Sequence, residues 1–332
     1  MEGYPEDGAL FDVERQVSPV DLPARLSPSR AGDFMQCPLM FRFRVIDKIP
    51  EPPSLAATRG TLVHAVLERL FDLPIGQRTP DEAAALIAPQ WERLVGRSPD
   101  LQEMFGSPAE LAEWLESARS LLGRYFTLED PNRLEPAQRE LFVRAEIGPE
   151  AGRLELRGVV DRLDIAPGGL LRVVDYKTGK APAAGYEAKT LFQMKFYALI
   201  LWRSRGTIPK RLQLIFMGSG DLLTYDPTEQ DLVGTEKKIL AIWQAIASAA
   251  QQGVWPATPT KLCGWCSFKP ICPAHGGDCP PAPQVQLVPA KASEQKTDRD
   301  QQAGATSAVP LTLPAPTKSA DSAEPAASQP IS

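Results

Sequence analysis

The stretch that decides the fold is Leu156-Arg157-Gly158-Val159-Val160-Asp161-Arg162-Leu163-Asp164, followed by Val173-Val174-Asp175-Tyr176-Lys177-Thr178-Gly179. Both segments alternate and are rich in valine and leucine, which indicates two strands. The intervening Pro167-Gly168-Gly169 has the composition of a turn, so we predict a β-hairpin. Such a hairpin brings Asp161 and Asp175 together at one end.

Two adjacent carboxylates repel each other, so keeping both ionised is costly unless a cation lies between them. A small set of oxygen ligands suits Mg²⁺ or Mn²⁺. Lys177, two residues after Asp175, is then placed to stabilise or position what the metal activates. Taken alone, the pattern also fits a surface hairpin whose acids pair with Arg162 and Lys177.

Helical and strand patterns surround the hairpin. Apolar residues at helical spacing predict a helix over residues 59–73, and strands are expected at residues 140–147 and 211–217. A succession of helices followed by a β-rich centre with helices packed on it predicts a mixed α/β domain. Further helices are expected at about 29–46 (interrupted near Pro38), 81–95, 108–128, 187–204 and 228–251.

Composition divides the chain into three parts. Residues 1–24 are acidic and contain proline, and we expect a flexible arm there. From Asp278 onward the chain has no aromatic residue and is dominated by Pro, Ala, Ser and Gln, so we expect residues 278–332 to be disordered. The folded domain is then expected over residues 25–277.

Charge and hydropathy bound the function classes. The net charge of −5 does not point to nucleic acid, so a DNA partner requires a local basic face, for which Arg42, Arg44, Lys48 and Arg59 are candidates. There is no run of eighteen apolar residues and no signal-peptide pattern, so we expect a cytoplasmic protein without a membrane partner. In that compartment, cysteines indicate metal binding or catalysis rather than disulfides.

Three polar residues on predicted helices have two readings each. His64 lies on an amphipathic helix, where a histidine is usually a packed side chain, yet its neutral imidazole is suited to complete a site with two carboxylates. Gln193 and Tyr197 lie four residues apart and share a helical face. In one interpretation, both side chains orient Lys177 or a phosphate through hydrogen bonds. In the other, Tyr197 is an ordinary core residue and Gln193 an ordinary surface residue.

Four cysteines have metal-binding spacing. Cys263, Cys266 and Cys272 are closely spaced near the end of the expected domain, and Cys37 is their lone upstream partner. Four thiolates hold either zinc or an iron–sulfur cluster, and the one-plus-three arrangement favours the cluster. Either metal would join the first helix to the end of the domain, and Cys279 is left free. Trp265 and Phe268 in this loop suit either packing over the metal or stacking on bases.

The ordered set of motifs resembles the RecB-type branch of the PD-(D/E)XK nuclease superfamily, in particular the AddB nuclease domain and the CRISPR-associated adaptation nucleases. The order is Cys, Gly-x-x-x-His, Gly-x-x-Asp-Arg-x-Asp, Asp-Tyr-Lys-Thr-Gly, Gln-x-x-x-Tyr and Cys-x-x-Cys-x5-Cys. The resemblance implies a restriction-endonuclease-like α/β core, in which a mixed central sheet is flanked by helices. It adds an N-terminal helical region and a C-terminal four-cysteine metal clasp.

The same resemblance implies a role for each matching residue. It gives His64, Asp161 and Asp175 as ligands of Mg²⁺ or Mn²⁺, Lys177 as the catalytic lysine, and Gln193 and Tyr197 as supporting residues. Glu140 occupies an acidic position on the preceding strand, with a less defined role. The four cysteines Cys37, Cys263, Cys266 and Cys272 would ligate a 4Fe–4S cluster, with zinc as the alternative.

The implied activity is a metal-dependent DNA exonuclease acting on single-stranded DNA or DNA ends in repair or recombination. The resemblance also implies a protein partner such as a helicase, since the chain has no Gly-x-x-x-x-Gly-Lys-Ser/Thr run of its own. The alternative is an idle DNA-end-binding or scaffolding module. The intact pair of acids with its lysine argues against an idle site.

Overall fold

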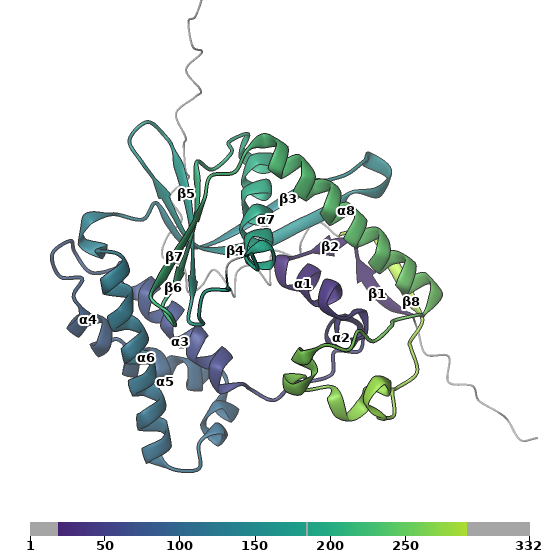
Figure 1. The fold of residues 1–332 in the computed structure, drawn as a ribbon, viewed down its shortest axis with the longest axis horizontal. Helices are drawn as coiled ribbons and strands as arrows, with labels where there is room; N and C mark the ends of the chain where they lie inside the picture. The colour runs from purple at the N-terminus through teal and green to yellow at the C-terminus, as the bar shows by residue number, and fades with distance from the viewer. Residues whose placement is uncertain (1–18, 184, 291–332) are drawn as a thin grey trace, which may run out of the picture.

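A computed structural model describes residues 19–183 and 185–290. A six-stranded mixed sheet lies between two groups of helices, and two further strands form a separate sheet (Figure 1). The strands are β1 (Val20–Pro23), β2 (Arg25–Leu26), β3 (Gln138–Ile147), β4 (Leu154–Ile165), β5 (Leu171–Lys177), β6 (Arg211–Phe216), β7 (Asp221–Tyr225) and β8 (Val285–Val288). The helices are α1 (Pro28–Gln36), α2 (Pro38–Phe41), α3 (Leu55–Leu70), α4 (Pro80–Ala85), α5 (Ile87–Arg97), α6 (Pro108–Leu128), α7 (Ala188–Arg205) and α8 (Glu229–Gln252).

The central strand β4 has two differently occupied edges. One edge pairs with the antiparallel β3 along nearly its whole length. The other edge pairs with β2 at Glu155 and Leu156 and with β5 from Arg162 to Ile165. Residues 157–161 between these two pairings have no strand partner on that edge among the described residues. The fold therefore leaves an opening in the sheet beside Asp161.

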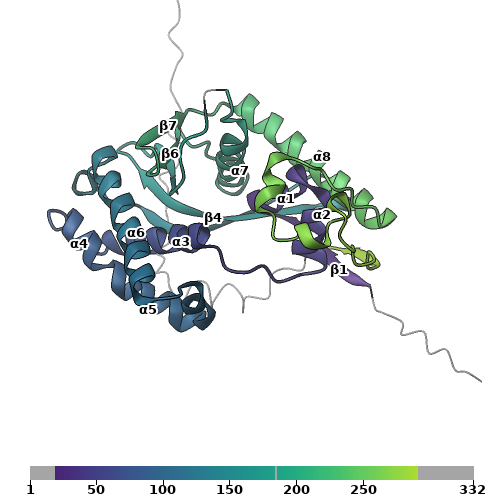
Figure 2. The same cartoon turned by 60° about the horizontal axis from the view of Figure 1, so that its bottom comes forward.

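Both faces of the sheet are covered. Because successive strand side chains point to opposite faces, Val173 of β5 packs in one apolar core and Val174 in the other. Helices α1, α7 and α8 contribute to the first core, and α3 to α6 form the second. Figure 2 shows β4 crossing the molecule between the α3–α6 group and the module that contains α1 and α2. This confirms the predicted mixed α/β architecture.

Prolines set two of the helix breaks. Pro38 keeps the preceding Cys37 extended, at φ −163° and ψ 109°, and so separates α1 from α2. Pro89 lacks the N–H that would bond to the carbonyl of Ala85 and crowds that carbonyl, and α4 ends at Ala85. The single helix expected over residues 81–95 is therefore two helices, whereas the expected break near Pro38 is confirmed.

The ordered body extends past both expected boundaries. Strand β1 pairs in parallel with β8, from Val20↔Val285 to Pro23↔Val288. The end of the expected flexible arm and the beginning of the expected disordered tail are thus strands that pair with each other. The two strands pair without an aromatic residue, and their aliphatic side chains also pack on the first core, where Leu22 is buried and Val285 and Leu287 contact it. Residues 1–18 and 291–332 lie outside the described residues.

Within the part of the chain that the structure describes, no helix combines the length and the apolar character needed to cross a membrane.

Candidate functional site

Three acids lie in one row across three neighbouring strands. The β4–β5 ladder ends at Arg162↔Val174, and one step further along the same register Asp161 faces Asp175. The β3–β4 ladder runs through Arg139↔Arg162 and Leu141↔Val160, a register that places Glu140 opposite Asp161. Like charges opposite one another destabilise a sheet. A row of three carboxylates therefore needs a compensating positive charge.

The backbone is distorted at this row. Glu140 has a φ of 45°, a conformation that non-glycine residues adopt only at a cost of about 1–3 kcal/mol. The carboxylate of Asp161 accepts a hydrogen bond from the backbone N–H of Tyr176 at 2.7 Å, a donor that a regular ladder would use elsewhere. Asp161 is thereby fixed at the point where β4 and β5 separate.

His64 reaches the row from helix α3. Its Nε2 lies 2.9 Å from the carbonyl oxygen of Tyr176, and its Nδ1 lies 3.4 Å from Oδ2 of Asp161. A carbonyl oxygen only accepts, so Nε2 carries a hydrogen and donates it. This leaves Nδ1 as the atom that faces the acids, which is the usual orientation of a histidine that ligates a metal.

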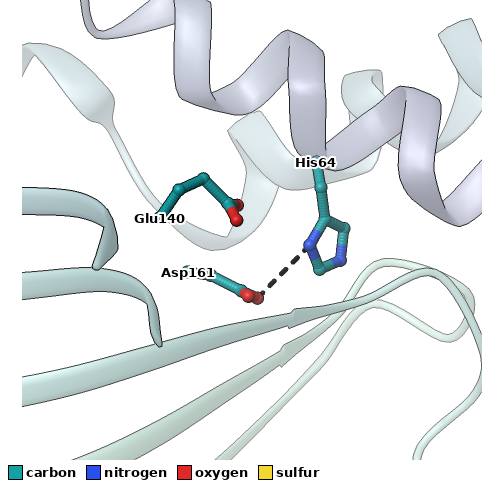
Figure 3. A group of neighbouring side chains, drawn as sticks. All are labelled: His64, Glu140 and Asp161. Carbon is teal, nitrogen blue, oxygen red and sulfur yellow. Dashed lines mark ion pairs between the residues drawn. The ribbon is translucent and has the colours of Figure 1, made fainter. Parts of the chain in front are cut away.

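His64, Glu140 and Asp161 form the group with metal-binding geometry. Their ligand atoms all lie within 4.8 Å of one another, and Figure 3 shows the three side chains converging from α3, β3 and β4. The predicted set contained Asp175 where this group contains Glu140. Asp175 lies on the other side of Asp161, and its role as a ligand stays a prediction. The acidic strand position was visible in the sequence, but its register with Asp161 was not.

Burial and mutual repulsion shift the protonation of this cluster. Burial and the neighbouring Asp161 raise the pKa of Glu140 to about 7 and that of Asp175 to about 6. Burial lowers the pKa of His64, but the carboxylates of Asp161, Asp175 and Glu140 together outweigh burial and raise the pKa of His64 to about 9. Without a metal, the cluster therefore retains protons that a divalent cation would displace.

Lys177, Gln193 and Tyr197 form a connected chain at Asp175. The ammonium of Lys177 lies 2.6 Å from Oδ2 of Asp175 and donates to Oε1 of Gln193 at 3.0 Å. The amide of Gln193 donates to Oδ1 of Asp175 at 3.0 Å and contacts the hydroxyl of Tyr197 at 3.2 Å. Asp175 itself is buried, and its Oδ2 has the Lys177 ammonium as a close partner. The structure thus brings the predicted catalytic Lys177 and the predicted supporting residue Gln193 to Asp175, and Tyr197 joins them through Gln193.

A glycine makes room for this chain. A Cβ placed on Gly158 would lie 2.6 Å from Cε1 of Tyr197, well inside van der Waals contact. The Tyr197 ring therefore packs directly against the backbone of β4, in the stretch that has no strand partner. This close approach is a physical reason for glycine at that position.

Arg162, the residue after Asp161 on β4, is the centre of an ion-pair network that the sequence did not indicate. Arg162 has no exposed surface and pairs with both oxygens of Glu129, at 2.6 and 2.8 Å. It also lies 3.1 Å from Asp164 and donates to the hydroxyl of Tyr176 at 2.8 Å. Because the backbone of Tyr176 contacts both His64 and Asp161, this network supports the residue that positions two of the metal-binding side chains.

Two cavities approach the site from opposite ends. One, of about 640 Å³, extends along α1 and α7 to Lys177, Gln193 and Tyr197, and includes Arg157 and Lys189. The other, of about 500 Å³, reaches His64 and Glu140, and its wall includes Arg69, Arg93 and Arg97. The predicted basic residues lie elsewhere: Arg42 is buried and donates to the carbonyls of Pro280 and Pro281, and Arg44 pairs with Asp33 and Glu51.

The four predicted metal-binding cysteines gather at one cavity. Cys37, in the break between α1 and α2, lines a cavity of about 330 Å³ together with Cys263, Cys266 and Cys272. Among the described residues, no three of these sulfurs lie within 4.8 Å of one another. Cys279 lies apart, 3.8 Å from Nη1 of Arg42.

Comparison with known proteins agrees with this geometry. Residues 25–273 match the family model described as the PD-(D/E)XK nuclease superfamily. The chain is 25% identical over 282 residues to the Gene 69 protein of Mycobacterium phage D29, an alignment that spans 76% of this chain and 98% of that protein. It is 24% identical over 289 residues to the Gene 69 protein of Mycobacterium phage L5, spanning 76% and 97%. A structural match titled "Crystal structure of SSO0001" has a TM-score of 0.37 and 15% identity, and covers 76% of this chain and 87% of that one.

Proposed function

Because this chain belongs to the PD-(D/E)XK nuclease superfamily, we propose that it is a metal-dependent DNA exonuclease that hydrolyses phosphodiester bonds in single-stranded DNA or at DNA ends. The observation that carries this proposal is the row of Glu140, Asp161 and Asp175, flanked by an imidazole and an ammonium. We propose DNA repair or recombination as its setting.

The residues at the row fit a divalent ion. Nδ1 of His64 and the carboxylates of Glu140 and Asp161 would hold it, and Asp175, which also pairs with Lys177, would add a carboxylate from the neighbouring strand. A bound Mg²⁺ or Mn²⁺ lowers the pKa of a coordinated water and neutralises charge on the phosphate. The backbone of Tyr176 fixes both His64 and Asp161, so these two ligand atoms are held before a metal arrives.

Lys177 supplies the positive charge on the other side of Asp175. Its ammonium is only partly exposed and lines the larger cavity, where it would stabilise negative charge that develops on the phosphate. Gln193 restricts the ammonium through Oε1 and restricts Asp175 through its amide. Tyr197 in turn contacts Gln193, so Gln193 and Tyr197 act as positioning residues.

We also propose that Cys37, Cys263, Cys266 and Cys272 ligate a 4Fe–4S cluster. Their convergence on one cavity supports a shared metal. Structural zinc is usually held by two close pairs of ligands, so one upstream cysteine and three closely spaced ones suit a cluster better.

The proposal is tested with end-labelled single-stranded and duplex DNA in the presence of Mn²⁺ or Mg²⁺. Asp161→Asn and Glu140→Gln should each lower the cleavage rate by about two orders of magnitude or more, since each removes one charged group at the site. Glu146→Gln is the matched control, because Glu146 also lies on β3 but is exposed and pairs with the exposed Arg153.

Two results would contradict the proposal. An Asp161→Asn variant that cleaves as fast as the wild type would exclude the assigned site. A wild-type protein that binds DNA but does not cleave it in the presence of any divalent metal would favour the idle end-binding module instead.

A further inference from the structure

Trp265 is a large side chain that the fold leaves in solvent. It is 82% exposed, whereas Trp91, Trp114 and Trp255 are buried. The neighbouring Phe268 is 3% exposed and packs against Phe43, with ring centroids 5.2 Å apart. Packing therefore accounts for Phe268 but not for Trp265, whose indole is open to a ligand.

The segment around Trp265 is basic in an acidic chain. Residues 237–277 contain no Asp or Glu, although the whole chain has a net charge of −5. Lys261 and Lys269 are exposed on either side of Trp265, and Leu262 beside it is 47% exposed. An exposed aromatic ring between two lysines matches a nucleic-acid strand, which presents flat bases and negative phosphates. A protein partner would instead be expected to bring acids to the lysines.

The surface of Trp265 continues into the candidate active site. Trp265 lines the cysteine cavity, and Gln36 lines both that cavity and the larger cavity that contains Lys177. Gln36 also accepts a hydrogen bond from Lys189, another residue of the larger cavity. Met35, 38% exposed, lines the larger cavity next to Gln36. One strand lying in the larger cavity would therefore reach Trp265.

Resting on the proposed nuclease function, we propose that Trp265 is a base-stacking platform for single-stranded DNA. Lys261 and Lys269 contact the phosphates that flank the stacked base, and the same strand extends through the larger cavity to Lys177. Stacking on an indole requires a free base face, which paired bases inside a duplex do not present. The contact therefore selects single strands and unpaired ends of any sequence.

The experiment measures binding of the full-length protein to a fluorescent oligothymidylate in Ca²⁺, together with quenching of tryptophan emission. Trp265→Ala should weaken binding about tenfold, and Trp265→Phe, which keeps a stacking ring, less than about threefold. Lys261→Gln and Lys269→Gln should each reduce the slope of log K against log salt by about 0.7. Ile75→Ala is the control, because Ile75 is a 60% exposed apolar residue outside both cavities. Folding of each variant is checked by its melting temperature.

The outcomes separate this inference from the proposed function. A wild type that cleaves DNA in Mn²⁺, while Trp265→Ala binds the oligonucleotide as tightly as the wild type, overturns the stacking platform and leaves the nuclease intact. A wild type that binds the oligonucleotide with quenching of tryptophan emission, a quenching that is lost in Trp265→Phe, but that does not cleave DNA in Mn²⁺ or Mg²⁺, supports the platform and refutes the nuclease.

Discussion

Replacing Gly158 with alanine should disable the site although Gly158 carries no functional group. The added Cβ would lie 2.6 Å from Cε1 and 3.3 Å from Cδ1 of Tyr197. Carbon atoms settle at about 3.5–4.0 Å, so the ring has to move by roughly 1 Å. Its hydroxyl contacts Gln193 at 3.2 Å, and Gln193 holds both Asp175 and Lys177. A misplacement of about 1 Å can cost about a hundredfold in kcat, and overpacking about 1–3 kcal/mol in the free energy of unfolding.

The assay compares kcat and urea unfolding for Gly158→Ala, Tyr197→Ala and the double variant. Once the ring is absent, the alanine meets no obstacle, so the two substitutions should be strongly non-additive. Gly123→Ala is the control: Gly123 lies inside α6 with open space around its missing Cβ, and alanine there should stabilise by about 0.5–1 kcal/mol. A Gly158→Ala enzyme with wild-type kcat, or additive effects in the double variant, would refute the reasoning.

Three other predictions concern the charges and the thiols. Glu140 has a pKa raised from 4.5 to about 7, so between these pH values the folded protein holds a proton that the unfolded chain releases. The melting temperature of metal-free protein should therefore fall as the pH rises from about 4.5 to 7, and Glu140→Gln should reduce this fall. Calorimetry at several pH values measures both. Glu129→Gln should cost about 3–5 kcal/mol in urea unfolding because Arg162 stays buried without its bidentate partner, whereas Glu146→Gln should change little. Cys263→Ser should abolish the visible absorbance of anaerobically purified protein, whereas Cys279→Ser should retain it; a colourless wild type with stoichiometric zinc would contradict the cluster.

Local patterns predicted the parts of the fold that depend on local rules. The alternation and turn residues around Asp161 and Asp175 predicted the hairpin, and helical spacing predicted α6 and α7 to within a residue or two. The break at Pro38 follows from steric rules that need no tertiary context. These features are encoded within windows of a few residues, so the sequence alone was sufficient.

The remaining features depend on register and on distant pairing. The acidic character of Glu140 was visible, but its position opposite Asp161 follows from how β3 aligns with β4. Glu129 lies 33 residues from Arg162, and nothing in the local pattern of either residue announces the pair. The strands β1 and β8 have only four residues each, which is too short to be recognised before they are seen paired. Each of these features is specified by three-dimensional contacts rather than by composition.

The pairing of β1 with β8 has a consequence for how the chain folds. Each strand is only four residues long, and the two strands lie almost at opposite ends of the described chain. Closing so long a loop carries a large entropic penalty, so this small sheet should form late, after the central domain has brought the two segments together. Local unfolding should then begin at the β1–β8 sheet, and amide protons of residues 20–23 should exchange with solvent sooner than those of β4 and β5.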